Sequence, residues 1–190
     1  SIYFNGDVNQ RDKLTDLLDD YHSTARHAFR VMQAYEKWLD ETPELQLLYC
    51  LGLFDHPVEK KVLEVLWNEK INGLTESIPL KAWKVAIHDL TEKYRLLSTH
   101  EGHPEILDCH PLIRQYFGER LRSKKYKSWN KAHEVLYYYY KKLPEQQLPE
   151  TLDQMRPLFN AISHGCMANL HMETLKDILW ERVRRKEQAY

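Results

Sequence analysis

The stretch that decides the fold lies in the middle of the chain, where residues 96–117 read LLSTHEGHPEILDCHPLIRQYF. Two short runs of strand-forming residues, 96–99 and 105–108, flank a polar segment whose glycine and proline are typical of a hairpin turn. Pro111 then opens an amphipathic helix, because proline suits the first helical turn. The sequence therefore predicts a two-stranded hairpin that is followed at once by a helix.

Three further helices are predicted before this hairpin. Thr42-Pro43 combines a helix cap with a first-turn proline ahead of a strongly apolar segment, and Asp55-His56-Pro57 repeats that signal ahead of a helix over Val58–Trp67. An amphipathic helix over Leu80–Tyr94 follows a loop. Three helices and then a hairpin wing are the order of a winged-helix domain, which we place at residues 42–125.

Helical patterns flank this domain on both sides. Residues 1–41 contain amphipathic patterns over 11–20 and 24–39, and we predict a helical segment there. Residues 126–190 contain amphipathic helices with short connections, which resemble tetratricopeptide-type hairpins. The predicted fold class is mainly α, with a helical segment, a winged helix with a small β-hairpin wing, and α-helical hairpins at the C-terminal end.

The C-terminal helices have clear sequence signals. One runs over Tyr126–Leu143, and a second begins at Thr151, where Gln154 completes a capping-box pattern. Pro157 lies inside the second pattern, so we expect a kink or a later start. A third helix is predicted over His171–Lys186.

Composition restricts the possible classes of protein. The chain has 190 residues, 27 Lys and Arg against 28 Asp and Glu, and a formal net charge of −1, which argues against a protein that coats nucleic acid. No apolar run approaches the ~18 residues of a membrane span, and nothing reads as a signal peptide. Three scattered cysteines make no disulfide framework, so a cytoplasmic location is expected. Because the chain begins at Ser1, we expect it to be part of a longer protein.

The common catalytic signatures are missing from the sequence. There is no Walker-type phosphate loop, no Gly-x-Gly-x-x-Gly, no Gly-x-Ser-x-Gly and no His-Glu-x-x-His. We therefore expect no enzymatic activity from this chain alone.

His110 is the residue with the most informative position. It directly precedes Pro111 and so falls at or near the N-cap of the predicted helix. A helix N-terminus carries about half a positive charge and suits an anion such as phosphate, to which a neutral imidazole N–H can donate. The plainer alternative is that His110 caps its own helix or packs under the wing.

A family resemblance favours the phosphate role. The run Leu107–Phe117, with the hairpin before it, resembles the winged-helix end of the STAND signal-transduction ATPases, which include the NB-ARC and NACHT families. Their Met-His-Asp motif, often Leu-His-Pro in bacterial members, corresponds to Cys109-His110-Pro111. Upstream, Tyr35–Leu39 and Leu51–Pro57 are similar to the bacterial members, and downstream Pro157–Cys166 is similar to the start of their C-terminal repeats.

The resemblance implies a regulatory function. In the family, the motif histidine contacts the β-phosphate of bound ADP and holds the closed state, and this role would fall on His110. The chain would then couple the ADP or ATP state of a missing ATPase domain in the same parent protein to a C-terminal sensor region. Bacterial defence, an unknown sensed ligand or protein, and homo-oligomer formation on activation are further implications. No cofactor is expected in the chain itself.

Other functions remain open from the residues. A winged helix usually binds DNA, but the predicted third helix mixes Lys81 and Lys84 with Asp89, and the wing carries only acidic charges. A basic cluster after the wing is interpreted as a solvated helix end; its members are Arg120, Arg122, Lys124, Lys125 and Lys127. A plain helical interaction scaffold is a third possibility.

A possible zinc site and a run of four tyrosines are two further candidate sites. A zinc site has suitable ligand types in His100, His103, Cys109 and His110, but their spacing matches no common zinc pattern, and we predict no metal. In the run Tyr137–Tyr140, the helical period places Tyr139 and Tyr140 on the inner face and leaves Tyr137 and Tyr138 outside it. The plainer interpretation is that these tyrosines pack against the following helix pair. The functional interpretation is that Tyr137 and Tyr138 form a partner surface, because exposed tyrosine is common at binding hot spots.

Overall fold

A computed structural model of the chain describes residues 27–100, 102–144 and 148–184. The chain divides into two compact units, Ser1–Asp40 and Glu41–Tyr190. In the first unit, residues 27–38 are helical, which confirms the C-terminal part of the helix expected over 24–39. The helix expected over 11–20 lies outside the described residues.

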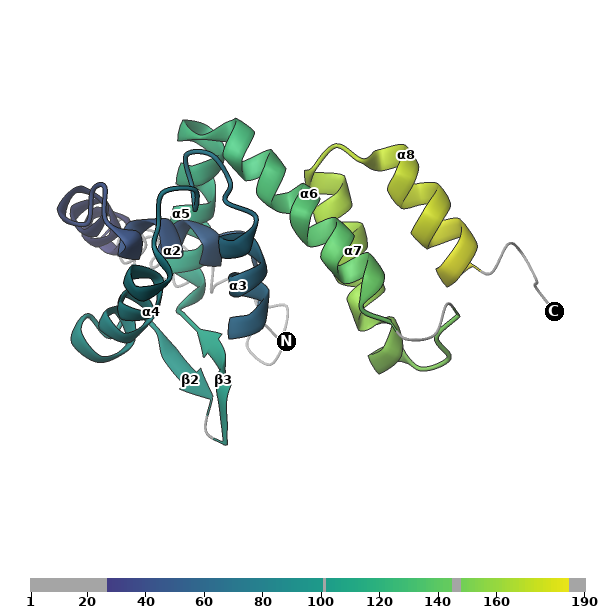
Figure 1. Ribbon diagram of the computed structural model, residues 1–190, viewed down its shortest axis with the longest axis horizontal. Helices are drawn as coiled ribbons and strands as arrows, with labels where there is room; N and C mark the ends of the chain where they lie inside the picture. Colours follow the sequence, from purple (N-terminus) through teal and green to yellow (C-terminus); the bar gives the residue numbers. More distant parts are fainter. Residues whose placement is uncertain (1–26, 101, 145–147, 185–190) are drawn as a thin grey trace, which may run out of the picture. The chain divides into compact units, whose positions relative to one another are not determined.

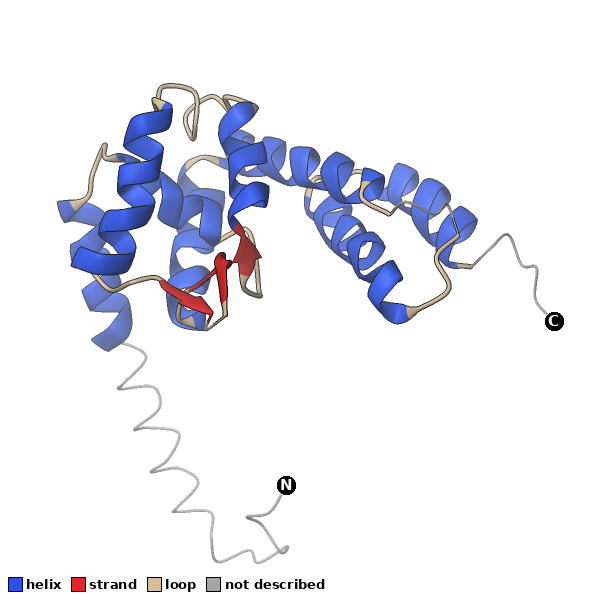
Figure 2. Cartoon of the chain, turned by 60° about the horizontal axis from the view of Figure 1, so that its bottom comes forward, coloured by secondary structure: helices blue, strands red, loops and turns tan. Residues whose placement is uncertain are grey.

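The second unit is mainly helical with one small antiparallel sheet, as Figures 1 and 2 show, and this confirms the predicted mainly-α class. Its elements are α2 (Pro43–Leu51), β1 (Val58–Glu59), α3 (Lys60–Asn68), α4 (Leu80–His88), β2 (Ser98–His100), β3 (His103–Asp108), α5 (Pro111–Lys124), α6 (Tyr126–Lys142), α7 (Leu152–Met167) and α8 (His171–Glu173). Two of them, α4 and α8, continue as π-helical segments, Asp89–Lys93 and Thr174–Val183. Among the described residues, no helix is long and apolar enough to cross a bilayer.

Helix α2 packs against α3, α4 and α5. The side chain of Thr42 accepts a hydrogen bond from the backbone N–H of Leu45, and Pro43 occupies the first turn, so the predicted cap is confirmed. Most of the helix is buried, as expected for a helix that is apolar nearly all round. The buried residues are Leu45, Leu47, Leu48, Tyr49, Cys50 and Leu51.

The sheet contains one strand more than the sequence predicted. Its strand order is β1-β3-β2, and both pairings are antiparallel. We predicted a helix from Val58, which is wrong by two residues, because Val58 pairs with Leu107 of β3 and α3 begins at Lys60. Both side chains are almost fully buried, and a β-branched residue favours such a cross-strand contact over a helical first turn.

A buried threonine joins the end of α3 to the following loop. Thr75 is fully buried, and its hydroxyl donates a hydrogen bond to the carbonyl oxygen of Leu66 at 2.9 Å. The hydroxyl oxygen of Thr75 also accepts a hydrogen bond from the backbone N–H of Ile71 at 2.9 Å. One side chain therefore satisfies a carbonyl that the end of α3 leaves unpaired and a backbone N–H of the loop after it.

Replacing Thr75 with valine is expected to lower the free energy of unfolding by about 2–3 kcal/mol, because two buried backbone groups lose their partner. Thr75→Ser retains the hydroxyl and is the matched control. Urea unfolding of both variants measures the difference. A valine variant as stable as the original chain would show that the hydroxyl does not hold this loop.

The C-terminal helices pack along one another. The predicted capping box is present at the start of α7, where Thr151 and Gln154 each bond to the other's backbone N–H. The later start that we allowed for is wrong, because α7 begins at Leu152 and continues through Pro157. Because Pro157 has no N–H, the carbonyl oxygen of Asp153 loses its hydrogen bond within the helix. Asp153 is exposed, so water can bond to that oxygen instead.

Candidate functional site

His110 is exposed and stands at the N-cap of α5. Its Nδ1 accepts a hydrogen bond from the backbone N–H of Leu112 at 3.2 Å. In the neutral imidazole, an acceptor Nδ1 leaves the proton on Nε2. The side chain therefore caps its own helix with one nitrogen and keeps one N–H available for a partner outside.

The backbone of this helix start is less open to an anion than the sequence suggested. Pro111 has no N–H, Leu112 donates to the imidazole, and Ile113 and Arg114 donate to the carbonyl oxygen of His110. The first-turn amides are thus already satisfied within the chain. An anion at this place would depend on the Nε2–H of His110 and on the helix dipole.

The residues on either side of His110 are held in place. Cys109 is buried, and burial raises the pKa of its thiol to about 11, so it stays protonated at neutral pH. Arg114, one turn into α5, is buried and forms an ion pair with Asp108 at the end of β3. This pair links the sheet to the helix that carries His110.

The alternative of a zinc site gains no support. The Nδ1 of His103 is paired with the carboxylate of Glu105 at 2.9 Å, and the side chain of His100 is outside the described part of the chain. Within that described part, no three His, Cys, Asp or Glu side chains are gathered so that they could hold a metal ion.

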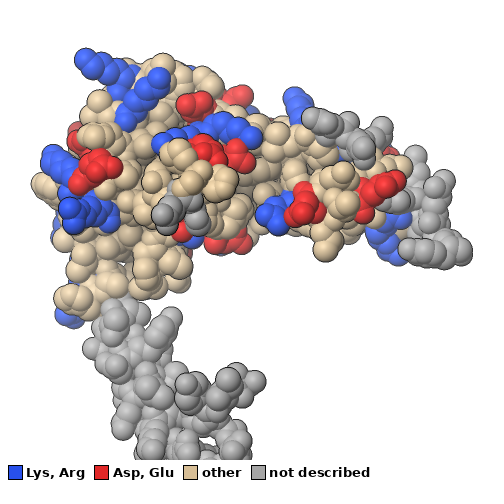
Figure 3. All heavy atoms as spheres, turned by 90° about the horizontal axis from the view of Figure 1, so that it is seen from below, with Lys and Arg blue, Asp and Glu red and all other residues tan. Residues whose placement is uncertain are grey.

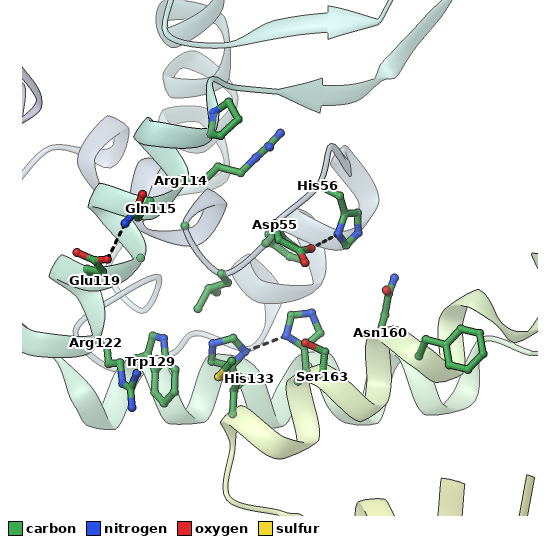
Figure 4. Close-up of a pocket in the computed structure, with 18 residues that line it drawn as sticks. Asp55, His56, Arg114, Gln115, Glu119, Arg122, Trp129, His133, Asn160 and Ser163 are labelled. Carbon is green, nitrogen blue, oxygen red and sulfur yellow. Dashed lines mark hydrogen bonds and ion pairs between the residues drawn. The ribbon is translucent and has the colours of Figure 1, made fainter. Parts of the chain in front are cut away.

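A cleft of about 690 Å³ begins beside His110, at Pro111 (Figure 4). One wall is a side of α5 that runs from Pro111 to Arg122, a second is the loop 52–56 after α2, and a third is formed by α6 and α7. Arg114 lines this cleft from α5, and its guanidinium pairs with Asp108 at the end of β3. The cleft is therefore enclosed by elements from the sheet-bearing part and from the C-terminal helices of the same unit.

The floor of the cleft contains a buried histidine pair. The Nδ1 of His133 on α6 lies 2.8 Å from the Nδ1 of His164 on α7. A hydrogen bond between two Nδ1 atoms requires one ring to donate and the other to accept. Burial lowers the pKa of His133 to about 3 and that of His164 to about 4, so both rings are neutral at physiological pH.

The remaining polar groups of the cleft are mixed in charge. The Nδ1 of His56 lies 2.6 Å from the carboxylate of Asp55, and this hydrogen bond lowers the pKa of Asp55. The guanidinium of Arg122 lies over the ring of Trp129, 5.0 Å from its centroid. Because positive and negative groups balance here, the cleft selects for no single charge on a ligand.

The histidine pair was not predicted as a site, although one signal was present. His133 falls on the inner stripe of α6, among Trp129, Ala132 and Leu136. A histidine at an apolar position indicates a buried polar partner, but the sequence alone does not identify that partner as His164.

The predicted partner surface is partly wrong. Tyr137 is fully buried, whereas Tyr138 is 43% exposed. The π-helical segment Thr174–Val183 packs on α7 and also reaches α6, where Lys141 forms an ion pair with Asp177. The ring of Tyr137 lies against Gly165, beside Thr174. A role for Tyr138 in partner binding stays a prediction.

Comparison of the chain with models of protein families, with curated proteins and with solved structures gives no match.

Proposed function

We propose that this chain is a non-catalytic regulatory region that responds to the nucleotide bound by an ATPase domain of the same parent protein, as in the STAND ATPases that it resembles. ADP or ATP would be bound by that ATPase domain and not by this chain. The C-terminal helices would connect the nucleotide state to a sensor region. Assembly of several copies on activation belongs to the same proposal.

The order of elements supports a winged helix as part of this proposal. The helix α2 is followed by β1, α3, α4 and the hairpin β2–β3, and β1 joins the sheet beside β3. A short first strand that completes the wing sheet is typical of winged-helix domains. The antiparallel packing of α6 on α7 supports a tetratricopeptide-like hairpin in the same way.

The observation that carries the proposal is the free Nε2–H of an exposed His110. A side chain that served only as a cap would need no more than an oxygen acceptor, which serine, threonine, aspartate or asparagine supplies. Histidine adds a second nitrogen that donates outward, next to a helix dipole that favours negative charge. The ion pair Arg114–Asp108 fixes the helix on which this donor stands.

His110→Ala in the parent protein is expected to weaken ADP binding about tenfold, because one hydrogen bond to a charged phosphate is lost. His110→Ser retains an acceptor for the helix cap but lacks the outward N–H, so it should weaken ADP binding to the same extent. His103→Ala, at an exposed histidine of the hairpin, is the matched control. Isothermal titration with ADP measures all three.

The pair of substitutions separates the two roles of His110. Alanine also removes the cap and is expected to destabilise the fold by about 1 kcal/mol, whereas serine is not. If serine leaves ADP affinity unchanged, His110 is only a cap and the nucleotide proposal fails. A plain interaction scaffold would show no nucleotide dependence in any variant.

A further inference from the structure

The exposed side of α4 combines aliphatic and basic side chains. It consists of Leu80, Lys81, Lys84, Val85 and His88, which together we name the α4 face. Their spacing places them on one side of the helix, while Trp83 and Ala86 hold the opposite side in the core. No carboxylate is present among the five residues.

The aliphatic members of the α4 face are partly exposed. Leu80 is 43% exposed and Val85 is 46% exposed, and both line a shallow, open surface hollow of about 600 Å³ that is formed by side chains of α4 alone. Single exposed aliphatic residues are common on proteins. Two of them that share one hollow, with basic groups around them, form the kind of apolar centre and polar rim that binding surfaces have.

Lys81 does not stabilise the helix that carries it. Lys81 lies in the first turn of α4, which has no acidic residue, and a cation there is disfavoured by about 0.3–1 kcal/mol through the helix dipole. Across the part of the chain that the structure describes, neither Lys81 nor Lys84 forms an ion pair. These charges are thus free to meet an anionic group from outside.

We propose that the α4 face binds an acidic amphipathic segment of a partner protein. Apolar side chains of that segment would enter the hollow between Leu80 and Val85, and its carboxylates would pair with Lys81 and Lys84. A helix laid on a groove makes such contacts through residues three and four apart. Complementary charge at the rim sets the choice of partner.

A protein segment fits this surface better than duplex DNA does. The described hairpin residues, 98–100 and 102–108, contain no Lys or Arg and carry an exposed carboxylate at Glu105, so the hairpin offers phosphates no cationic side chain to contact. The centre of the α4 face is aliphatic, whereas base edges and phosphates require hydrogen-bond donors. Figure 3 shows Lys and Arg mixed with Asp and Glu on the face of the molecule seen from below, with no continuous basic surface there.

A random-peptide display library, selected on the intact chain, tests this inference. We expect the selected peptides to be enriched in Asp and Glu around apolar positions three and four apart. Against such a peptide, Lys81→Glu/Lys84→Glu is expected to lower affinity at least about tenfold, because two attractive contacts become repulsive. Lys127→Glu/Lys176→Glu makes the same change in net charge at two exposed lysines elsewhere and is expected to leave affinity within about twofold.

Leu80→Ser/Val85→Ser tests the apolar part and is expected to abolish binding while the chain still unfolds cooperatively, because neither side chain is part of the buried core. The inference is overturned if no peptide is selected, if the selected peptides lack acidic residues, or if charge reversal on α4 has no more effect than the control. Salt-sensitive binding of duplex DNA that depends on Lys81 and Lys84 would overturn it in favour of nucleic acid. None of these outcomes depends on the nucleotide role of His110.

Discussion

Replacing Gly118 with alanine is expected to lower the free energy of unfolding by about 3 kcal/mol. Gly118 lies inside α5, where alanine normally stabilises a helix by about 0.5–1 kcal/mol relative to glycine. Here a Cβ atom would lie 2.3 Å from the backbone oxygen of Gly52, just after α2. Because backbone atoms cannot move aside as a side chain can, α2 and α5 would have to separate.

The reciprocal substitution should have a similar effect. A Cβ atom on Gly52 would lie 2.3 Å from the backbone nitrogen of Gly118, so the two glycines form one backbone-to-backbone crossing. Ser123→Ala is the matched control, because it raises helix propensity on an exposed site of the same helix. Chemical unfolding compares the variants. If Gly118→Ala raised the free energy of unfolding as Ser123→Ala does, the backbones of α2 and α5 would not be in tight contact at this crossing.

The stability of the chain is expected to fall as the pH is lowered below about 6.5, through the buried pair of His133 and His164. Burial keeps both rings neutral when folded, with pKa values of about 3 and about 4, while an unfolded histidine titrates at about 6.5. Between those values the unfolded state binds more protons than the folded state, so acid favours unfolding. At pH 5 the loss amounts to about 2 kcal/mol for each histidine.

The groups around the histidine pair do not reverse the direction of this pH dependence. His164 is stacked on Tyr140 and faces two residues of the loop after α2, His56 and Asp55. His133 faces Arg122, which belongs to α5. Only Asp55 favours a protonated ring, and it is already paired with His56. The positive neighbours oppose protonation of the pair.

The double variant His133→Leu/His164→Leu is expected to remove most of this pH dependence between pH 7.5 and pH 5. Both partners of the hydrogen bond are removed together, so no buried polar group is left unpaired. His171→Leu, at an exposed histidine of α8, should retain the dependence of the original chain. Urea unfolding at the two pH values measures the slopes. If the free energy of unfolding changed equally with pH in the double variant and in His171→Leu, groups other than His133 and His164 would cause the acid sensitivity.

Helix α5 is involved both in the crossing at Gly118 and in the cleft above His133 and His164. His110 caps the N-terminus of α5, and Gly118 in its middle crosses the chain just after α2. One side of α5, from Pro111 to Arg122, forms a wall of the cleft above the histidine pair. A change in the packing of α5 would therefore reach both the exposed imidazole and the C-terminal helices. This arrangement suits an element that transmits a signal, as the proposed regulatory function requires.

The sequence by itself determined the features that depend on neighbours within a few residues. The caps at Thr42 and Thr151 were predicted and are present, and His110 caps α5 as its plainer alternative stated, because each bond joins atoms two or three residues apart. The cap signal at Asp55-His56-Pro57 is wrong, because α3 begins at Lys60 and has no side-chain cap. The helical period also identified the buried faces of α2 and α5, since apolar side chains on one face of a helix must be covered. The hairpin followed from its turn residues in the same way.

Only the tertiary structure decided which distant segments meet. The strand at Val58 exists because Leu107, far along the chain, pairs with it, and a run of two residues has no period of its own. Tyr137 is buried because a third helical segment covers a side of α6 that one neighbour would leave open. His133 and His164 form a pair because α6 and α7 bring them within 2.8 Å. Such contacts depend on the packing of whole elements, which local propensity and periodicity do not encode.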